Sequence, residues 1–141
     1  MPKKRFFLAK SEPDVYSIDD LQRDGRTTWD GVRNPQARMA IQAMHLGDLV
    51  LIYHSGGISA VVGVAKVLSE PVDAPDNPKM TVVDLEFIFK LSEPVTLKAV
   101  KESGLFADFN LVRNSRLSTM EAPASFIAWM KKLRPELKKV L

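Results

Sequence analysis

The stretch "DLVLIYHSGGISAVVGVAKVL", residues 48–68, decides the fold because it holds two apolar strands joined by a glycine turn. Side chains alternate along a strand, so Tyr53 and His54 point to opposite faces. Both faces of residues 49–53 are apolar, which is typical of a strand buried on both sides. The Gly-Gly pair at 56–57 predicts the hairpin turn. Gly63 in the return strand predicts a bulge or a close approach of another element.

Strand and helix signals on either side of this hairpin complete the pattern. We expect further strands at residues 5–10, 81–91 and 116–122, and Val83, Leu85, Phe87 and Phe89 should face the core. Ser17, Asn34 and Thr96 are suitable N-caps, and Pro35 suits a first helical position. The four predicted helices cover residues 17–25, 34–47, 96–103 and 123–133, and the last should bury Phe126, Ile127, Met130 and Leu133.

The resulting order of elements is β-α-α-β-β-β-α-β-α. It has no repeat of strand, crossover helix and strand, which argues against a doubly wound fold. We predict an α+β fold in which a small mixed or antiparallel β-barrel is flanked by helices. The length of 141 residues fits one domain, residues 1–141.

Composition excludes several classes of function. The chain has no Cys, which excludes disulfides and thiol chemistry, and its two His lie nine residues apart without a ligand cluster, which makes a zinc site improbable. No apolar run approaches the roughly 20 residues that span a bilayer, and the N-terminal apolar stretch is too short for a signal peptide. We therefore expect a cytoplasmic monomer without a membrane partner, a metal or another cofactor.

Basic residues are concentrated at the two ends of the sequence. The net charge is +3, but residues 1–47 carry +2, residues 48–97 carry −4 and residues 98–141 carry +5, by counts of Lys and Arg against Asp and Glu. If the ends meet in the fold, they make one basic face. Such a face favours a polyanionic partner without proving one.

The stretch "TTWDGVRNPQAR", residues 27–38, has the pattern of a loop that leads into a helix. Trp29 has two interpretations, a core residue that anchors the loop or an aromatic wall that stacks on a planar ligand. Asn34 is an N-cap on either interpretation, and a helix N-terminus also presents free N–H groups to an anion. Arg33 is either a solvated side chain or a phosphate contact at the same place.

Three other polar stretches are candidate binding elements. "KSEPD" (10–14) follows the first strand, where Ser11 and Glu12 are either a polar turn or the mouth of a pocket. "YHS" (53–55) ends a buried strand, where a lone His is usually a hydrogen-bonded core residue and Tyr53 is a possible second aromatic wall. "RNSRLS" (113–118) is either a solvated face or a phosphate-contacting surface.

Besides binding of a polyanionic partner, the sequence leaves two classes of function open. It contains no GxSxG, Walker or GxGxxG motif. Glu12, Asp30 and His54 have the residue types of an acid–base set, although their spacing does not indicate one. An enzyme that acts on a modified nucleotide is therefore one alternative. A module that binds a small molecule or a protein is another.

The motifs "LAKSEPD" (8–14), "WDGVRNPQAR" (29–38), "AMHLGDLVLIYHS" (43–55), "DNPKMTVVDLEF" (76–87) and "RLS" (116–118) resemble, in this order, the EVE domain family. The resemblance covers nearly the whole chain. It implies a PUA-like fold, a small β-barrel flanked by helices, and a non-catalytic module that reads a modified base, a modified cytosine or adenine, in DNA or RNA. YTH domains, which belong to the same wider group, are similar in the layout of Lys10, Ser11 and Trp29.

The resemblance and the residues together predict a base pocket. Trp29 would stack on a flipped or single-stranded base, backbone groups of residues 30–32 and the Asn34 side chain would read its polar edge, and residues 53–55 would form the opposite wall. The predicted base pocket consists of Ser11, Glu12, Trp29, Asp30, Val32, Asn34, Tyr53, His54 and Ser55. The predicted phosphate or nucleic-acid contacts are Lys10, Arg33, Arg116 and Ser118.

Overall fold

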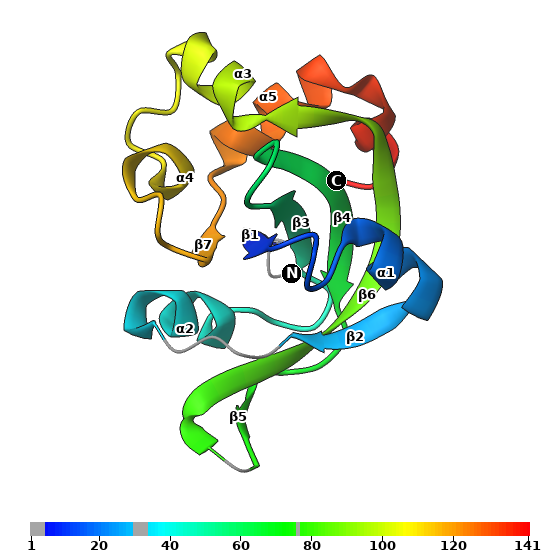
Figure 1. Ribbon diagram of the computed structural model, residues 1–141, viewed down its shortest axis with the longest axis vertical. Coiled ribbons are helices and arrows are strands. Elements are labelled where there is room, and N and C mark those ends of the chain that lie inside the picture. Colours follow the sequence, from blue (N-terminus) through cyan, green and yellow to red (C-terminus); the bar gives the residue numbers. More distant parts are fainter. Residues whose placement is uncertain (1–4, 30–33, 76) are drawn as a thin grey trace.

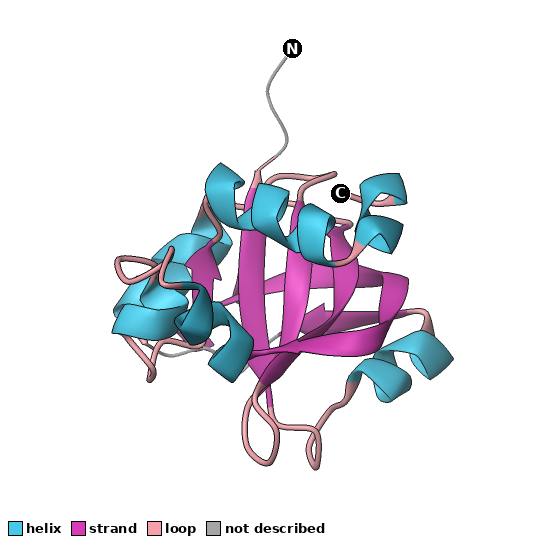
Figure 2. Cartoon of the chain, turned by 90° about the horizontal axis from the view of Figure 1, so that it is seen from above, coloured by secondary structure: helices cyan, strands magenta, loops and turns pink. Residues whose placement is uncertain are grey.

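The computed structural model describes residues 5–29, 34–75 and 77–141 and shows a mixed α+β fold (Figure 1). Helices lie on both sides of one strongly curved sheet (Figure 2). In chain order the elements are β1 (Phe6–Ser11), α1 (Ile18–Asp24), β2 (Arg26–Trp29), α2 (Pro35–Gln42), β3 (Leu49–His54), β4 (Ala60–Val67), β5 (Val72–Ala74), β6 (Asn77–Thr96), α3 (Leu97–Ser103), α4 (Asn110–Arg113), β7 (Thr119–Glu121), α5 (Ala124–Leu133) and the 3-10 helix η1 (Pro135–Lys139).

The predicted hairpin forms the centre of the sheet. β3 and β4 pair antiparallel from Leu49 opposite Lys66 to His54 opposite Ala60, and the glycines at 56 and 57 take the positive φ that the turn requires. The register shifts between Ile52 and Tyr53, so β4 carries the bulge that Gly63 predicted. Residues 49–53 are all buried, in agreement with a strand that is covered on both faces.

The strands are ordered β2-β6-β4-β3-β1-β7, and β5 pairs with β6 beside this path. β1 runs parallel to β3, whereas the other pairs are antiparallel. The predicted barrel is wrong in one respect: the sheet is curved but not closed, because its edge strands β2 and β7 do not pair. Helix α2 packs against both β7 and β6 and so occupies the seam between the two edges (Figure 1).

The three predicted N-caps are confirmed. Ser17 and Asp20 form a reciprocal capping box at α1, and Thr96 accepts from the N–H of Ala99 at α3. Asn34 caps α2, with Pro35 at its first position. The predicted end of α2 at Gly47 is wrong, because the helix stops at Gln42 and Gly47 lies in the turn before β3.

Two strands differ from the sequence-based expectation, because pairing with neighbouring strands determines their position and length and the local sequence pattern does not. Residues 26–29 form β2 although their stretch has the pattern of a loop, since β6 supplies a partner from Val83 to Glu86. β6 spans 20 residues, longer than residues 81–91, because it pairs with β2, β4 and β5. Phe126, Ile127 and Met130 of α5 are buried as predicted, but Leu133 is 38% exposed at the helix end.

Gly63 lies where α1 approaches the sheet. A Cβ built on Gly63 would be 2.5 Å from Ile18 Cδ1 and 2.6 Å from the carbonyl oxygen of Phe89, both far closer than van der Waals contact. The absence of a side chain therefore allows α1 to cover β4. Ile18 is 3% exposed and fills the space.

We expect Gly63→Ala to lower the free energy of unfolding by about 1–3 kcal/mol, because the added Cβ must displace both Ile18 and the β6 backbone at Phe89. Urea unfolding monitored by circular dichroism measures this change. Ile18→Val removes the Cδ1 atom and should recover part of the loss in the double variant, while the Phe89 carbonyl prevents full recovery. A Gly63→Ala protein as stable as wild type would contradict the close packing of α1.

Candidate nucleic-acid interface

Parallel pairing of β1 and β3 brings two of the predicted polar stretches together at their carboxyl ends. Lys10 lies opposite Tyr53, Ser11 lies opposite His54, and the Ser55 N–H donates to the Ser11 carbonyl over 3.0 Å. On the other side of β1, the Lys10 N–H donates to the Ser118 carbonyl over 2.8 Å. We call the side chains of Lys10, Ser11, Tyr53, His54, Ser55 and Ser118 the strand-end cluster.

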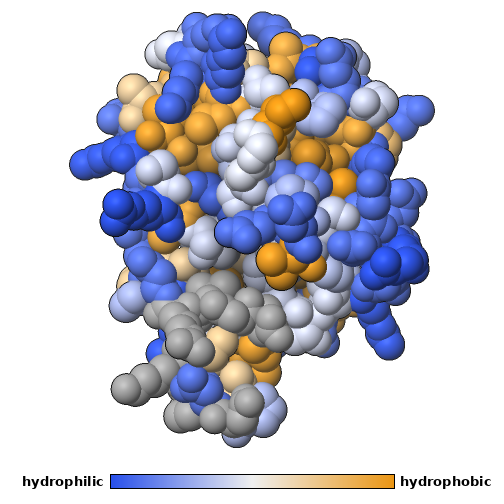
Figure 3. Space-filling view, viewed as in Figure 1, coloured by the Kyte–Doolittle hydropathy of each residue, from blue (hydrophilic) through white to orange (hydrophobic). Residues whose placement is uncertain are grey.

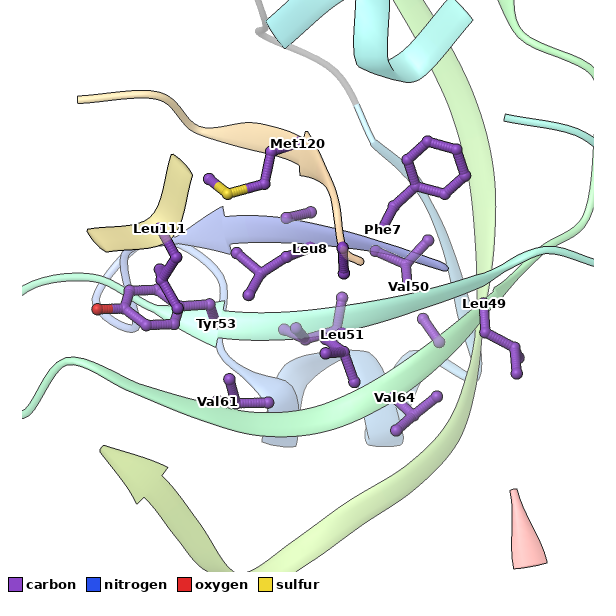
Figure 4. Packing of buried hydrophobic residues seen from close by; sticks show 14 of the residues in the cluster. Phe7, Leu8, Leu49, Val50, Leu51, Tyr53, Val61, Val64, Leu111 and Met120 are labelled. Atoms are coloured by element: carbon purple, nitrogen blue, oxygen red, sulfur yellow. The ribbon is translucent and has the colours of Figure 1, made fainter. Parts of the chain in front are cut away.

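The pleat divides this cluster between two faces of the sheet. Paired residues share a face, so Ser11 and His54 lie on one side and Lys10 and Tyr53 on the other. Tyr53 is only 3% exposed and belongs to the same hydrophobic core cluster as Leu8, Val61 and Leu111 (Figure 4). Burial raises the pKa of Tyr53, and a hydrogen bond with the Ser59 side chain acts in the opposite direction. The residues predicted as one opposite wall therefore do not face the same side.

Lys10 holds the segment that carries Arg116. Its Nζ donates to the Ser115 carbonyl over 3.0 Å and lies 5.5 Å from the centroid of the Tyr53 ring, within range of a cation–π interaction. Burial lowers the pKa of Lys10. The contact to Ser115 joins residues 105 positions apart, so no local sequence signal predicts it. Arg116 beside it is exposed, and Ser118 is partly buried.

His54 is a hydrogen-bonded structural residue. Its Nε2 accepts from the N–H of Ile18, the first residue of α1, over 3.0 Å, so the neutral ring carries its proton on Nδ1. Burial lowers the pKa of His54, Asp19 acts to raise it, and Lys90 acts to lower it further. Because a backbone amide occupies Nε2, this nitrogen is not available as a general base.

Ser11 and Glu12 organise the turn after β1. The Ser11 hydroxyl donates to the Tyr16 carbonyl over 2.6 Å. The Glu12 carbonyl accepts from the N–H groups of Val15 and Tyr16, both at 2.9 Å, and the residue is exposed. The backbone of this turn is thus fixed, while the Glu12 carboxylate faces outward.

Trp29 ends β2 opposite Val83 and is 9% exposed within the hydrophobic core. This burial agrees with its interpretation as a core anchor. Asn34 Oδ1 accepts from the N–H groups of Gln36 and Ala37 at 2.9 and 3.1 Å, which fixes the start of α2. The predicted contacts Asp30, Val32 and Arg33 lie outside the described residues.

The strand register does not place Trp29 beside the strand-end cluster. Ser11 and His54 share a row of the sheet that continues through Ala60 to Thr96, far along β6 from Val83. Helix α2 follows the segment after Trp29 and packs on β7, the neighbour of β1. The helix therefore links the Trp29 edge of the sheet with the β1 edge.

The N-terminal and C-terminal parts of the described chain meet where β1 pairs with β7. Hydrophilic side chains on the face shown in Figure 3 are interspersed with hydrophobic areas, so hydropathy alone does not delimit a site there. Three surface hollows lie elsewhere; for example, Arg5, Phe109 and Pro123 line one, and Ile58, Leu97 and Lys101 line another. None of these three hollows is lined by a predicted site residue.

Neither a metal centre nor a membrane-spanning helix is found in the part of the chain that the structure describes. No group of three or more His, Asp or Glu side chains there is arranged to hold a metal ion. None of the described helices is both long and apolar enough to cross a bilayer.

Comparisons with known proteins relate nearly the whole chain to one family. The family described as "EVE domain" matches residues 5–133. Thymocyte nuclear protein 1 of Rattus norvegicus is 32% identical over 124 residues, which cover 68% of this chain and 55% of the relative. The chain thus spans about half the length of the curated relatives that it matches first.

Solved structures show the same fold. Rpa0253 from Rhodopseudomonas palustris is 35% identical, with a TM-score of 0.87 and coverage of 94% of each chain. Human THYN1 protein, solved in complex with 5-methylcytosine containing DNA, is 26% identical, with a TM-score of 0.84 and coverage of 92% of this chain and 97% of the human one.

The lowered pKa of His54 makes stability depend on pH. Between that lowered value and the usual histidine pKa of about 6.5, the unfolded chain binds more protons than the folded chain. The contribution is fully present above about pH 6.5 and decreases as the pH falls through this window. We expect His54→Gln, which keeps an acceptor but does not titrate, to flatten this part of a urea-unfolding profile.

His45→Gln is the matched control for this experiment. His45 is exposed, and its Nδ1 lies 3.3 Å from Glu70 on the surface. The decrease in stability below about pH 6.5 should persist in this variant. If His54→Gln retained the wild-type profile, the bond between His54 and Ile18 would not be its source.

Proposed function

The chain belongs to the EVE domain family, and from this we propose that it is a non-catalytic module that binds nucleic acid carrying a modified base. One observation carries the proposal: the fold matches human THYN1 protein, solved in complex with 5-methylcytosine containing DNA, over almost the full length of both chains. A modified cytosine is accordingly the first ligand to test. The nucleic-acid partner and the absence of catalysis are both parts of the proposal.

The proposed base site lies where the Ser11 side of the strand-end cluster, Trp29 and the start of α2 border the curved sheet. Trp29 would supply the aromatic surface, and Ser11, Glu12, Asn34 and Ser55 the polar groups. The fixed turn at Ser11 and the capped helix at Asn34 support this assignment, because groups that are already ordered lose little entropy on binding. Tyr53 supports the site from the opposite face.

The energetic balance of such a site is favourable. Extrusion of a base from a duplex costs a few kcal/mol. Stacking on one aromatic side chain contributes about 1–3 kcal/mol, and each hydrogen bond adds about 1 kcal/mol net. Phosphate contacts then determine the overall affinity and its dependence on salt. Exposed Arg116, on the segment that Lys10 holds, is the described side chain that we assign to this role.

The geometry of His54 supports binding over catalysis. An acid–base mechanism with Glu12 and His54 needs a free imidazole nitrogen beside the substrate. Nε2 of His54 already accepts from the Ile18 amide, which also orients the ring toward α1. The His54 ring therefore stabilises the fold by fixing the start of α1.

The two Trp residues allow a direct test of binding at Trp29. Trp129 lies on α5 among other aromatic rings, with ring centroids 5.4 Å from Phe106 and 5.8 Å from Phe126. In the Trp129→Phe protein, tryptophan emission comes from Trp29 alone. We expect an oligonucleotide with 5-methylcytosine to quench this emission at a concentration at least about tenfold below that needed for the plain strand, because stacking brings a base against the ring.

Trp29→Phe is the matched control, since it retains a ring for stacking and leaves Trp129 as the reporter. Its emission should not change on binding, while fluorescence anisotropy of a labelled strand still records the complex. Strands with 5-hydroxymethylcytosine and N6-methyladenosine, as DNA and as RNA, complete the panel. Equal binding of every modified and plain strand would contradict the proposed function.

We expect Arg116→Gln to weaken binding of modified and plain strands by the same factor. The slope of log K against log salt concentration should become shallower by about 0.7–0.9, the contribution of one phosphate contact. Arg23→Gln is the control, because Arg23 is also exposed but pairs with Asp20 and Asp24 on α1. An unchanged slope in Arg116→Gln would remove Arg116 from the interface.

A further inference from the structure

Thr119, the first residue of β7, has a buried hydroxyl without a partner. The residue is 0% exposed, and its Oγ1 is the one buried side-chain oxygen or nitrogen without a hydrogen bond among the described residues. Native proteins satisfy most buried polar groups, because a lost hydrogen bond to water is otherwise not replaced. The core around Thr119 would accept Val at no such cost, so the hydroxyl needs an explanation.

The register places Thr119 on the Ser11 side of the sheet. Thr119 lies opposite Ala9 on β1, and Ala9 shares its face with Ser11 two residues further along. Met120, the next residue of β7, lies opposite Leu8 and points to the Tyr53 side. The unpartnered hydroxyl is therefore on the same face as the fixed turn at Ser11.

The neighbours of β7 belong to the proposed base site. Ser118 precedes Thr119, and its carbonyl accepts from Lys10. Helix α2, whose start is capped by Asn34, packs on β7. Ala9 and Ala37, which are small and fully buried, line this region of β1 and α2. Thr119 thus belongs to a strand that contacts both β1, which carries Ser11, and α2, which Asn34 caps.

We propose that Thr119 contacts the bound base, its hydroxyl forming a hydrogen bond with the polar edge of that base. The inference rests on the proposed function and adds to it a residue for which the motifs give no signal. A hydroxyl both donates and accepts, so it suits either an exocyclic amine or a ring acceptor. The hydroxyl is left unsatisfied in the protein alone and gains its partner from the ligand.

The test is Thr119→Val, which keeps the shape and removes the hydroxyl. We expect at least a tenfold loss of affinity for the preferred modified strand, equivalent to 1.4 kcal/mol. The melting temperature should be unchanged or higher, since removal of an unsatisfied buried hydroxyl does not destabilise. Thr119→Ser retains the hydroxyl and should bind within about threefold of wild type.

Thr81→Val is the matched control. Thr81 is equally buried, but its Oγ1 accepts from Arg38 Nε over 2.8 Å and from Gln42 Nε2 over 3.4 Å. The same substitution should therefore lower the melting temperature and leave the ratio of modified to plain binding unchanged. A melting temperature that falls in Thr81→Val but not in Thr119→Val would show that the Thr81 hydroxyl stabilises the fold and that the Thr119 hydroxyl does not.

Two results would overturn the inference. If Thr119→Val binds the modified strand as tightly as wild type, the hydroxyl does not contact the base. If Thr119→Ser loses as much affinity as Thr119→Val, the methyl group and not the hydroxyl is responsible. Failure of the proposed function is distinguishable, because the wild-type protein itself would then show no preference for any modified strand, and the role of Thr119 would fall with it.

Discussion

The parallel pairing of β1 with β3 is the constraint on which the arrangement depends. A parallel pair cannot be joined by a tight turn, so the chain must leave β1, form α1, β2 and α2, and return before β3 begins. That excursion places Trp29 and the cap of α2 at the opposite edge of the sheet. The pair also aligns two strand ends that carry Lys10 to Ser11 and Tyr53 to Ser55. Both the order of the elements and the position of the candidate interface therefore follow from the parallel pairing of β1 with β3.

Many polar side chains at the interface stabilise the fold and leave few groups free for a ligand. Lys10 holds the segment before β7, His54 holds the start of α1, and Ser11 holds the turn after β1. Each bond joins elements that are distant in sequence or changes the chain direction. Pre-organisation of this kind favours recognition, because the free backbone and remaining donors are already in position.

The sequence predicts the hairpin, the three helix caps and the α+β class because each depends on local chemistry. The Gly-Gly turn, the oxygen of Asn34 and the apolar run at 49–53 need no distant partner. It does not predict β2, the length of β6 or the open seam, since strand partners decide these. The site shows the same division. The motif resemblance selects Lys10, Ser11 and Trp29, whereas the contact of Lys10 with Ser115 and the burial of Tyr53 arise only from long-range packing.

The position of α2 in the seam has a mechanical consequence. In a closed barrel, any widening of the interior must break a ladder of backbone hydrogen bonds. Here β7 and β6 are bridged by helix α2, through its buried side chains Ala37 and Ile41 and through the hydrogen bond from Arg38 to Thr81 of β6. Outward displacement of α2 loses side-chain packing and a few polar contacts while every strand pair stays intact. The paired strands can thus remain rigid while the side of the sheet that α2 covers deforms.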